Sequence, residues 1–299
     1  MKKAAWIISF LLVVFAGDRL MGWYFKKQVS NSQFRYSKLY RGDATADIMV
    51  IGNSRGLNIY LPSIEALTAK KAISLCYNGM PGDLASVLTR DYIDRYPSVK
   101  TVIIELCMVE MPDEQLLPGF ASYMQYSPRI DSLIRSKFYQ TWFTSKISHL
   151  YQYNNEVFQR AIYYKNRSDN DWTSDRSMSE KLVKEVGRYG MEFHADANQL
   201  QHIKTITDYC RSRSIEVKLV IAPFFPGFVV KNIDLLKSKT EMITGCKVYD
   251  YSTVLQNSAS FSDYLHMNVR GCKEFVQILD KDGFLTPAQN TAQNDQIPY

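Results

Sequence analysis

Histidine is scarce in this sequence, with four residues among 299, and the five cysteines include no C-x-x-C pair. Zinc sites need clustered Cys and His ligands, so no metal site is predicted. Gly-rich phosphate loops are also missing, since neither G-x-x-x-x-G-K nor G-x-G-x-x-G occurs. The sequence therefore predicts no nucleotide ligand, and we expect the protein to work without a cofactor.

The cysteines are odd in number and widely spaced, at positions 76, 107, 210, 246 and 272. In an oxidising compartment they leave room for one or two disulfides, whose pairing the sequence does not assign. Cys76 and Cys107 stand at the ends of apolar runs, where a small apolar side chain is the ordinary occupant.

A basic surface is missing too, once the N-terminus is set aside. Residues 1–41 carry eight Lys and Arg residues against Asp18 alone, a net charge of +7, so the remaining residues sum to −1 within the total of +6. This distribution gives no support to nucleic-acid binding. It fits a basic segment beside anionic lipid.

The N-terminal segment has Lys2 and Lys3 followed by the uncharged run Ala4–Gly17. These fourteen residues are fewer than the ~20 that span a bilayer. Their number alone, with small residues at Val14 and Ala16, is typical of a cleaved signal peptide.

Apolar character resumes, however, at Leu20–Phe25. Trp6 and Trp23 would lie about 26 Å apart on a helix, which suits the two interfacial belts of a membrane span. We favour an uncleaved signal-anchor that comprises residues 1–27. It would cross the inner membrane once and leave the rest of the chain on the periplasmic side. A cleaved signal peptide is the alternative, and either one exports the remaining residues.

Five apolar, β-branched runs follow, mostly without polar alternation, as in strands buried on both faces. These runs are 47–51, 72–76, 99–106, 217–222 and 247–251, and helical periodicity marks 82–96, 198–213 and 269–280. Strands alternating with helices form β-α-β units. We therefore predict an α/β fold over residues 28–286, a flavodoxin-like three-layer α/β/α sandwich with a central parallel five-stranded sheet.

The alternation breaks between about 111 and 197, a stretch rich in Tyr, Phe, Trp and Met. We predict a mainly helical insertion there, emerging at the edge of the sheet where parallel strands place their sites. It would form a lid or a substrate platform, since aromatic surfaces stack on sugars, or only extra helices that cover the sheet. The polar tail at 287–299 is predicted to be disordered.

Ser54 follows the first apolar run, in the sequence Gly52-Asn53-Ser54. A strand that ends in Gly and turns sharply into a helix holds a serine hydroxyl clear of the sheet, near a helix N-terminus. The plain alternative is a turn serine or a helix N-cap.

His266 is the best candidate for a general base, because Asp263 stands three residues before it. On one turn, that carboxylate would hold the Nδ1–H and leave Nε2 for Ser54. The other histidines lie within a helix or lack a carboxylate at a suggestive spacing; they are His149, His194 and His202. The alternative is a loop histidine with an incidental aspartate.

The segment Asn78–Asp83 follows the second apolar run. Gly82 opens a predicted helix, so its N–H is free and the local dipole favours a developing oxyanion. The alternative is an ordinary Pro-Gly turn at the start of a helix, which would have the same sequence pattern.

Together these motifs resemble the SGNH (GDSL-type) hydrolase family over residues 47–106 and 217–284, with the middle of the chain outside the resemblance. The resemblance implies that Ser54 is the nucleophile, with His266 as the base and Asp263 as its partner. It also implies an oxyanion hole built from the N–H groups of Ser54 and Gly82, with Asn78 as a further donor.

The family's third block is missing from this sequence. A G-x-N-D motif would place an asparagine amide in the oxyanion hole, but the residues after the third run are Cys107-Met108-Val109-Glu110. Loss of one such donor typically lowers the rate by ~10²–10³. Asn78 or a group from the insertion would have to replace it.

The anchored architecture and the G-N-S-R start are more similar to membrane-tethered members that modify bacterial surface polysaccharides than to secreted lipases. We therefore expect a membrane-anchored serine esterase or O-acyltransferase that acts on an ester of a cell-surface glycan. The expected ester is an O-acetyl group. Polysaccharide-assembly proteins are the expected protein partners.

Two alternatives stay open at this point. One is a catalytically inactive scaffold of the same family, which binds glycan or a partner in an envelope assembly. The other is a flavodoxin-like binding module, which fits the fold but lacks a phosphate loop to support it.

Overall fold

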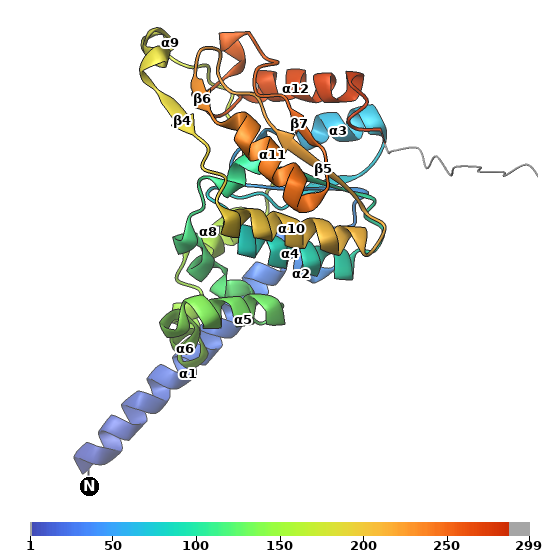
Figure 1. Cartoon of the computed structure of the whole chain (residues 1–299). Coiled ribbons are helices and arrows are strands. Elements are labelled where there is room, and N and C mark those ends of the chain that lie inside the picture. The colour runs from blue at the N-terminus through green and yellow to red at the C-terminus, as the bar shows by residue number, and fades with distance from the viewer. Residues whose placement is uncertain (1, 287–299) are drawn as a thin grey trace, which may run out of the picture.

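The computed structural model has a central sheet of five parallel strands in the order β2-β1-β3-β5-β7 (Figure 1). It describes residues 2–286, so the tail at 287–299, predicted to be disordered, lies outside the described residues. The strand order is that of flavodoxin-like sheets and confirms the predicted fold. The strands are β1 (Ile48–Ile51), β2 (Ala72–Ser74), β3 (Thr101–Glu105), β5 (Glu216–Ile221) and β7 (Val248–Asp250).

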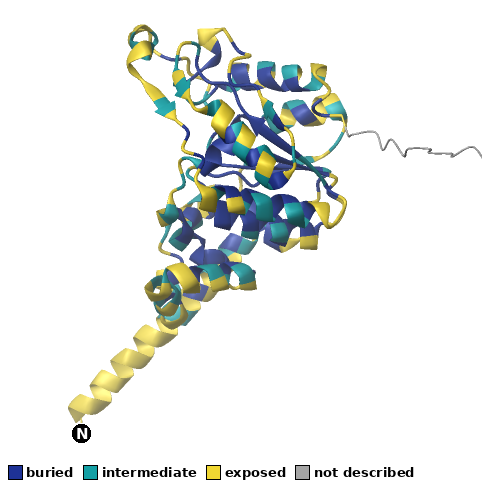
Figure 2. Ribbon diagram, viewed as in Figure 1, coloured by how far each residue is buried: buried dark blue, intermediate teal, exposed yellow. Residues whose placement is uncertain are grey.

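Helices cover both faces of this sheet because successive strand residues point to opposite sides and both sides are apolar. Met49, Val102 and Leu219 face one core, while Val50, Ile103 and Val220 face the other. The first core is covered by α4 (Gly82–Arg95), α10 (Ala197–Arg211) and α11 (Ile233–Thr244), and the second by α3 (Leu61–Thr68) and α12 (Val269–Lys281). Figure 2 shows the buried residues concentrated in the sheet and the inner faces of these helices.

The strands and three helices predicted from the sequence agree with the observed elements to within a few residues. The sequence did not predict α2 (Arg35–Arg41), α3 or α11. The first two have too few turns to show a helical period. In α11 the buried face includes Thr240 and Thr244, and these polar residues interrupt the apolar stripe.

The insertion is mainly helical, as predicted, but it also contains an unpredicted strand. That strand, β4 (Gly190–Glu192), pairs in parallel with β6 (Val229–Lys231) as a separate two-stranded sheet. In Figure 1, α5 and α6 lie at the end of the fold from which α1 projects, and α9 and β4 lie at the opposite end. The insertion follows the short helix η2 (Leu106–Val109). The helices of the insertion are η3 (Glu114–Tyr123), α5 (Pro128–Lys137), α6 (Tyr139–Ile147), α7 (His149–Gln152), α8 (Glu156–Tyr163), α9 (Glu180–Glu185) and η4 (Val186–Arg188).

The N-terminal helix α1 (Lys2–Ser30) is long and apolar enough to cross a membrane, as an anchor or a signal sequence would be. Its first half is exposed throughout and projects from the fold (Figure 2). Asp18 is the first residue of this helix that is not exposed. Its carboxylate accepts hydrogen bonds from Ser148 Oγ at 2.7 Å and from the N–H groups of His149 and Leu150 at 2.9 and 3.0 Å. The helix is thereby joined to the start of α7.

Gly22 allows α7 to approach α1 closely, since a Cβ at this position would lie 2.3 Å from His149 Cβ. We expect Gly22→Leu to displace α7 and to destabilise the protein by about 1–3 kcal/mol, the usual cost of overpacking. Gly17→Leu is the matched control, because nothing lies within 4 Å of its added Cβ. Thermal unfolding of the full-length protein in detergent should give a lower Tm for Gly22→Leu. Equal Tm values for the two variants would contradict this packing.

Candidate active site

The loop after β1 is held against the end of β3. Gly52 lies so close to Glu105 that an added Cβ would come within 3.0 Å of Glu105 Cβ, so a larger residue would push the loop away. Ser54 lies on the turn that follows, where Asn53 Oδ1 accepts the N–H of Arg55 at 3.0 Å. A short 3₁₀ helix, η1 (Gly56–Asn58), begins directly afterwards. Ser54 is half-buried at the carboxyl edge of the sheet.

A continuous chain of hydrogen bonds joins Ser54, His266 and Asp263. The distance from Ser54 Oγ to His266 Nε2 is 2.8 Å, and His266 Nδ1 lies 3.0 Å from both carboxylate oxygens of Asp263. The structure thus brings together the three residues predicted as nucleophile, base and orienting group. Their catalytic roles stay a prediction.

The loop that carries His266 is closed by short-range hydrogen bonds. Asp263 Oδ1 accepts the N–H groups of Leu265 at 2.8 Å and of His266 at 2.9 Å, so the spacing of three residues fixes the carboxylate beneath the imidazole. Phe261 and Met267 form an antiparallel bridge at the base of the loop. The arrangement is therefore set by the local sequence.

Burial raises the pKa of the Asp263 carboxyl, but hydrogen bonds from His266 and from two backbone N–H groups outweigh burial and lower that pKa below its ordinary value. The carboxylate is therefore ionised at neutral pH. Because its pKa is lower in the folded chain than in the unfolded one, Asp263 stabilises the fold above its ordinary pKa. That contribution is lost as the pH falls through the lowered value.

The three predicted oxyanion donors are placed differently. The Ser54 N–H has no acceptor within the described part of the chain. The Gly82 N–H, at the first residue of α4, faces Gln199 Oε1 of α10 at 3.4 Å. Asn78 is exposed and follows Tyr77, whose N–H donates to Gly52 O at 3.3 Å. Of the backbone donors, the N–H of Ser54 is the one left open in this conformation, and the oxyanion roles of all three residues stay predictions.

Cys107 lies in the segment where the family's third block would place an asparagine. It is fully buried in η2, and its N–H donates to Glu105 Oε2 at 3.0 Å. Burial, together with the nearby Glu105 carboxylate, raises the pKa of the Cys107 thiol, so the thiol is neutral. The segment therefore brings no amide side chain to the site. All five cysteines of the chain are free thiols.

A buried arginine beside the serine was missed by the sequence reasoning. Arg55 is fully buried, and its guanidinium donates to the carbonyl oxygens of Leu265, of Ala222 at 2.5 Å and of Pro223 at 3.1 Å. Its Nε lies 3.5 Å from Glu105 Oε1, and both side chains of this ion pair are fully buried. Arg55 thus joins the loop after β1 to the last residue of β3, to the segment after β5 and to the loop that carries His266.

This arginine also connects the two halves of the hydrogen-bonded chain. It follows Ser54 directly, and the carbonyl that it holds belongs to Leu265, the residue before His266. A signal for the pair was present in the sequence. Glu105 interrupts an apolar run with a charge, and parallel strands that run in register bring the ends of β1 and β3 to one edge.

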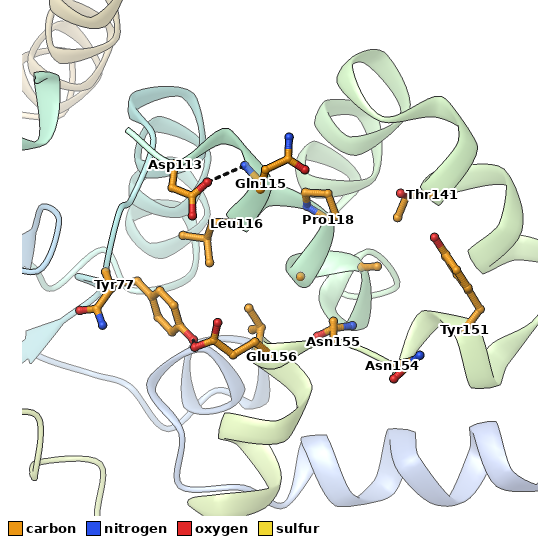
Figure 3. Close-up of a pocket in the computed structure, with 14 residues that line it drawn as sticks. Tyr77, Asp113, Gln115, Leu116, Pro118, Thr141, Tyr151, Asn154, Asn155 and Glu156 are labelled. Carbon is orange, nitrogen blue, oxygen red and sulfur yellow. Dashed lines mark hydrogen bonds between the residues drawn. The ribbon is translucent and has the colours of Figure 1, made fainter. Parts of the chain in front are cut away.

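A cavity of about 540 Å³ lies between the loop after β2 and the insertion (Figure 3). At one end Tyr77 donates a hydrogen bond to Glu156 Oε1 at 3.0 Å, and at the other Thr141 and Tyr151 face the cavity. Asn78, a predicted oxyanion donor, is part of the lining at the sheet edge. Amide, carboxylate, hydroxyl and aromatic groups therefore face one another across this space, whose lining does not include Ser54, Asp263 or His266.

Two of the other histidines contact a carboxylate from a distant segment, although neither has one at a suggestive spacing in the sequence. His194 binds Glu110 through its Nδ1 and its backbone N–H, and the side-chain hydrogen bond and the negative charge of Glu110 raise the pKa of His194. His149 donates its N–H to Asp18. Spacing along the chain did not reveal these pairs because their members come from distant segments. Within residues 2–286, no group of three or more His, Cys, Asp or Glu side chains is placed to hold a metal ion.

The chain matches no protein-family model and no curated protein sequence. Among solved structures it is similar to a candidate acylhydrolase from Bacteroides fragilis, with 11% sequence identity and a TM-score of 0.38 over 80% of this chain and 87% of that one. It is also similar to a candidate platelet activating factor from Streptococcus pneumoniae, with 12% identity and a TM-score of 0.39 over 94% and 99% of the two chains. Such values carry no argument about activity, which rests on the geometry of the site.

Proposed function

We propose that this protein is an exported, membrane-anchored serine esterase or O-acyltransferase that acts on an ester of a cell-surface glycan. The proposed ester is an O-acetyl group. The observation that carries the proposal is the hydrogen-bonded chain from Ser54 Oγ through His266 to Asp263, with 2.8 Å between Oγ and Nε2. A hydroxyl in contact with an imidazole that a carboxylate orients is the arrangement that makes serine nucleophilic at neutral pH.

In the first half of the reaction, Ser54 Oγ attacks the carbonyl carbon of the ester while its proton passes to His266 Nε2. The negative charge that forms on the carbonyl oxygen is stabilised by the open N–H of Ser54 and by a further donor. Asp263 stabilises the imidazolium and holds its Nδ1–H. The intermediate collapses when the bond to the leaving oxygen breaks and that oxygen takes the proton from Nε2, which leaves Ser54 acylated.

In the second half, His266 Nε2 removes a proton from the acceptor as the acceptor oxygen attacks the acyl carbon. Water as the acceptor gives an esterase, and a sugar hydroxyl gives an O-acyltransferase. Collapse of this second intermediate returns the proton to Ser54 Oγ. His266 and Asp263 are 30% and 43% exposed, so the site is open enough for either acceptor to reach it.

Two features support a glycan at the outer face of a membrane. The cavity beside Asn78 offers amide and hydroxyl groups together with aromatic rings, which suit sugar hydroxyls and sugar faces. Lys2 and Lys3 precede the apolar part of α1, and a basic start followed by an apolar run is the pattern of an export signal, which favours a domain outside the cytoplasm.

The nucleophile is tested with a fluorophosphonate probe on the full-length protein in detergent. We expect the probe to label the wild type and Ser132→Ala, a control at an exposed position in α5, and to leave Ser54→Ala unlabelled. The same reagent applied to His266→Ala should react far more slowly, because the general base is absent.

Equal labelling of the wild type and Ser54→Ala would refute the assignment of the nucleophile. No labelling of the wild type, together with no turnover of p-nitrophenyl acetate, would instead favour the inactive scaffold. An increase in acyl transfer over hydrolysis when a sugar acceptor is added would identify the transferase.

A further inference from the structure

The exposed length of α1 is short for a membrane span. Residues 2–17 are exposed without interruption, and Asp18 is already bound to α7. At 1.5 Å per residue, this free segment extends about 24 Å, against about 30 Å for the hydrocarbon core of a bilayer. A helix that crosses the bilayer from Lys2 therefore reaches the domain before it has left the lipid.

The junction between α1 and the domain is fixed by polar contacts. Asp18 is held by three hydrogen bonds from residues 148–150, and Arg19 donates to Ile147 O at 2.9 Å. The charges of this pair are therefore satisfied by the protein, so the helix can carry them at the level of the headgroups. On the flank of α1 away from α7, Leu20 and Trp23 stay exposed.

The part of the insertion around this junction presents an exposed apolar face. Tyr139, Phe143 and Ile147 recur every four residues and so form one stripe along α6, and the rings of Tyr139 and Phe143 stack 6.1 Å apart. Figures 1 and 2 show α6 beside the point where α1 leaves the fold, with exposed residues along both. The α6–α7 face is defined as the five residues Tyr139, Phe143, Ile147, Leu150 and Tyr151, which are 43–57% exposed.

Two basic groups beside this face lie against an aromatic ring, and one of them, Lys146, also pairs with Asp131 at 2.5 Å. The guanidinium of Arg135 lies 4.9 Å and the ammonium of Lys146 5.7 Å from the ring of Trp142. Aromatic and basic side chains grouped in this way are typical of surfaces that lie at the level of anionic lipid headgroups. Tyr151 also lines the cavity of Figure 3, but a water-exposed role would leave the other four apolar side chains of the face without an explanation.

We propose that the α6–α7 face enters the headgroup region of the same bilayer that α1 crosses, and so fixes the orientation of the domain on the membrane. The free part of α1 is too short to cross the whole bilayer, and entry of this face into the headgroup region makes up the missing depth. Thr141 and Tyr151, which belong to the same two helices, also line the cavity of Figure 3, so the cavity opens next to the membrane surface. The inference rests on α1 as a membrane anchor but not on the reaction proposed for Ser54.

The test places nitroxide spin labels on the full-length protein in vesicles of phosphatidylcholine and phosphatidylglycerol. Labels at Phe143→Cys and Ile147→Cys report on the face, Leu12→Cys on the free part of α1, and Met242→Cys, which is 77% exposed on α11, on water. Cys246→Ser removes the one cysteine that is not buried. At each label we compare the collision rate with oxygen to the collision rate with a water-soluble nickel complex. We expect the ratio of the two rates to be several-fold higher at 143 and 147 than at 242.

The outcomes separate the face from the anchor. The proposal would be overturned if the ratio of the two collision rates were the same at 143 and 147 as at 242. If the label at Leu12→Cys still lay deep in the bilayer, the anchor would remain intact. A water-exposed label at position 12 would overturn both. Labels at 143 and 147 that are shielded from both reagents in detergent as well as in vesicles would show that a second copy or another protein covers the face, which also overturns it.

Discussion

Asp263→Asn is expected to lower kcat for ester hydrolysis by about 10⁴-fold while leaving the fold intact. The asparagine carbonyl would still accept the N–H groups of Leu265 and His266, so the loop keeps its shape. Its amide would donate to Nδ1, and the imidazole would then carry its proton on Nε2. In that tautomer Nε2 cannot accept the proton of Ser54.

Turnover of p-nitrophenyl acetate by the full-length protein in detergent measures this effect. Asp175→Asn, at an exposed position, is the matched control and should keep the wild-type rate. The orienting role of Asp263 would be refuted by a variant that folds normally and retains more than a tenth of the wild-type kcat.

The second large effect is expected for Arg55→Leu, at about 3–5 kcal/mol of lost stability, the usual cost of removing one partner of a buried ion pair. Glu105 would be left as an unpaired charge that is fully buried, and the carbonyls of Leu265 and Ala222 would lose their donor. Urea unfolding of the full-length protein in detergent measures the loss. An unfolding free energy equal to that of the wild type would contradict this account.

The double variant Arg55→Leu/Glu105→Leu separates stability from positioning. Replacing both members of a buried pair by apolar residues is often close to neutral, so the double variant should recover much of the lost stability. The tie between the loops of Ser54 and His266 is still broken, however, so kcat should stay low while KM changes little. Full recovery of kcat together with stability would show that Arg55 supports the fold and does not position the site.

Much of the fold was predictable because its signals are local. A buried parallel strand needs only a short apolar, β-branched run, and β1, β3 and β5 each have one. Helices α4, α10 and α12 are long enough to show their period. The pair of β4 and β6 has no such signal, since its strands have three residues each and are mostly exposed.

The candidate site was predictable where its contacts are close in sequence. The contact between Asp263 and His266 spans three residues, and the loop that holds it is closed by its own backbone. The pairing of His194 with Glu110 spans 84 residues and was not expected. The burial of Arg55 depends on the ends of three separate strands and was also missed.

By itself, the sequence determined the apolar N-terminal helix, the alternation of strands and helices, and the loop that orients His266, because each depends on side chains within one or two turns of chain. Only the tertiary structure decided that Ser54 and His266, 212 residues apart, lie in hydrogen-bonding contact. It also decided that Asp18 binds the insertion. These contacts follow from the order of the strands and from the packing of the insertion against α1, and no short segment of the chain encodes either.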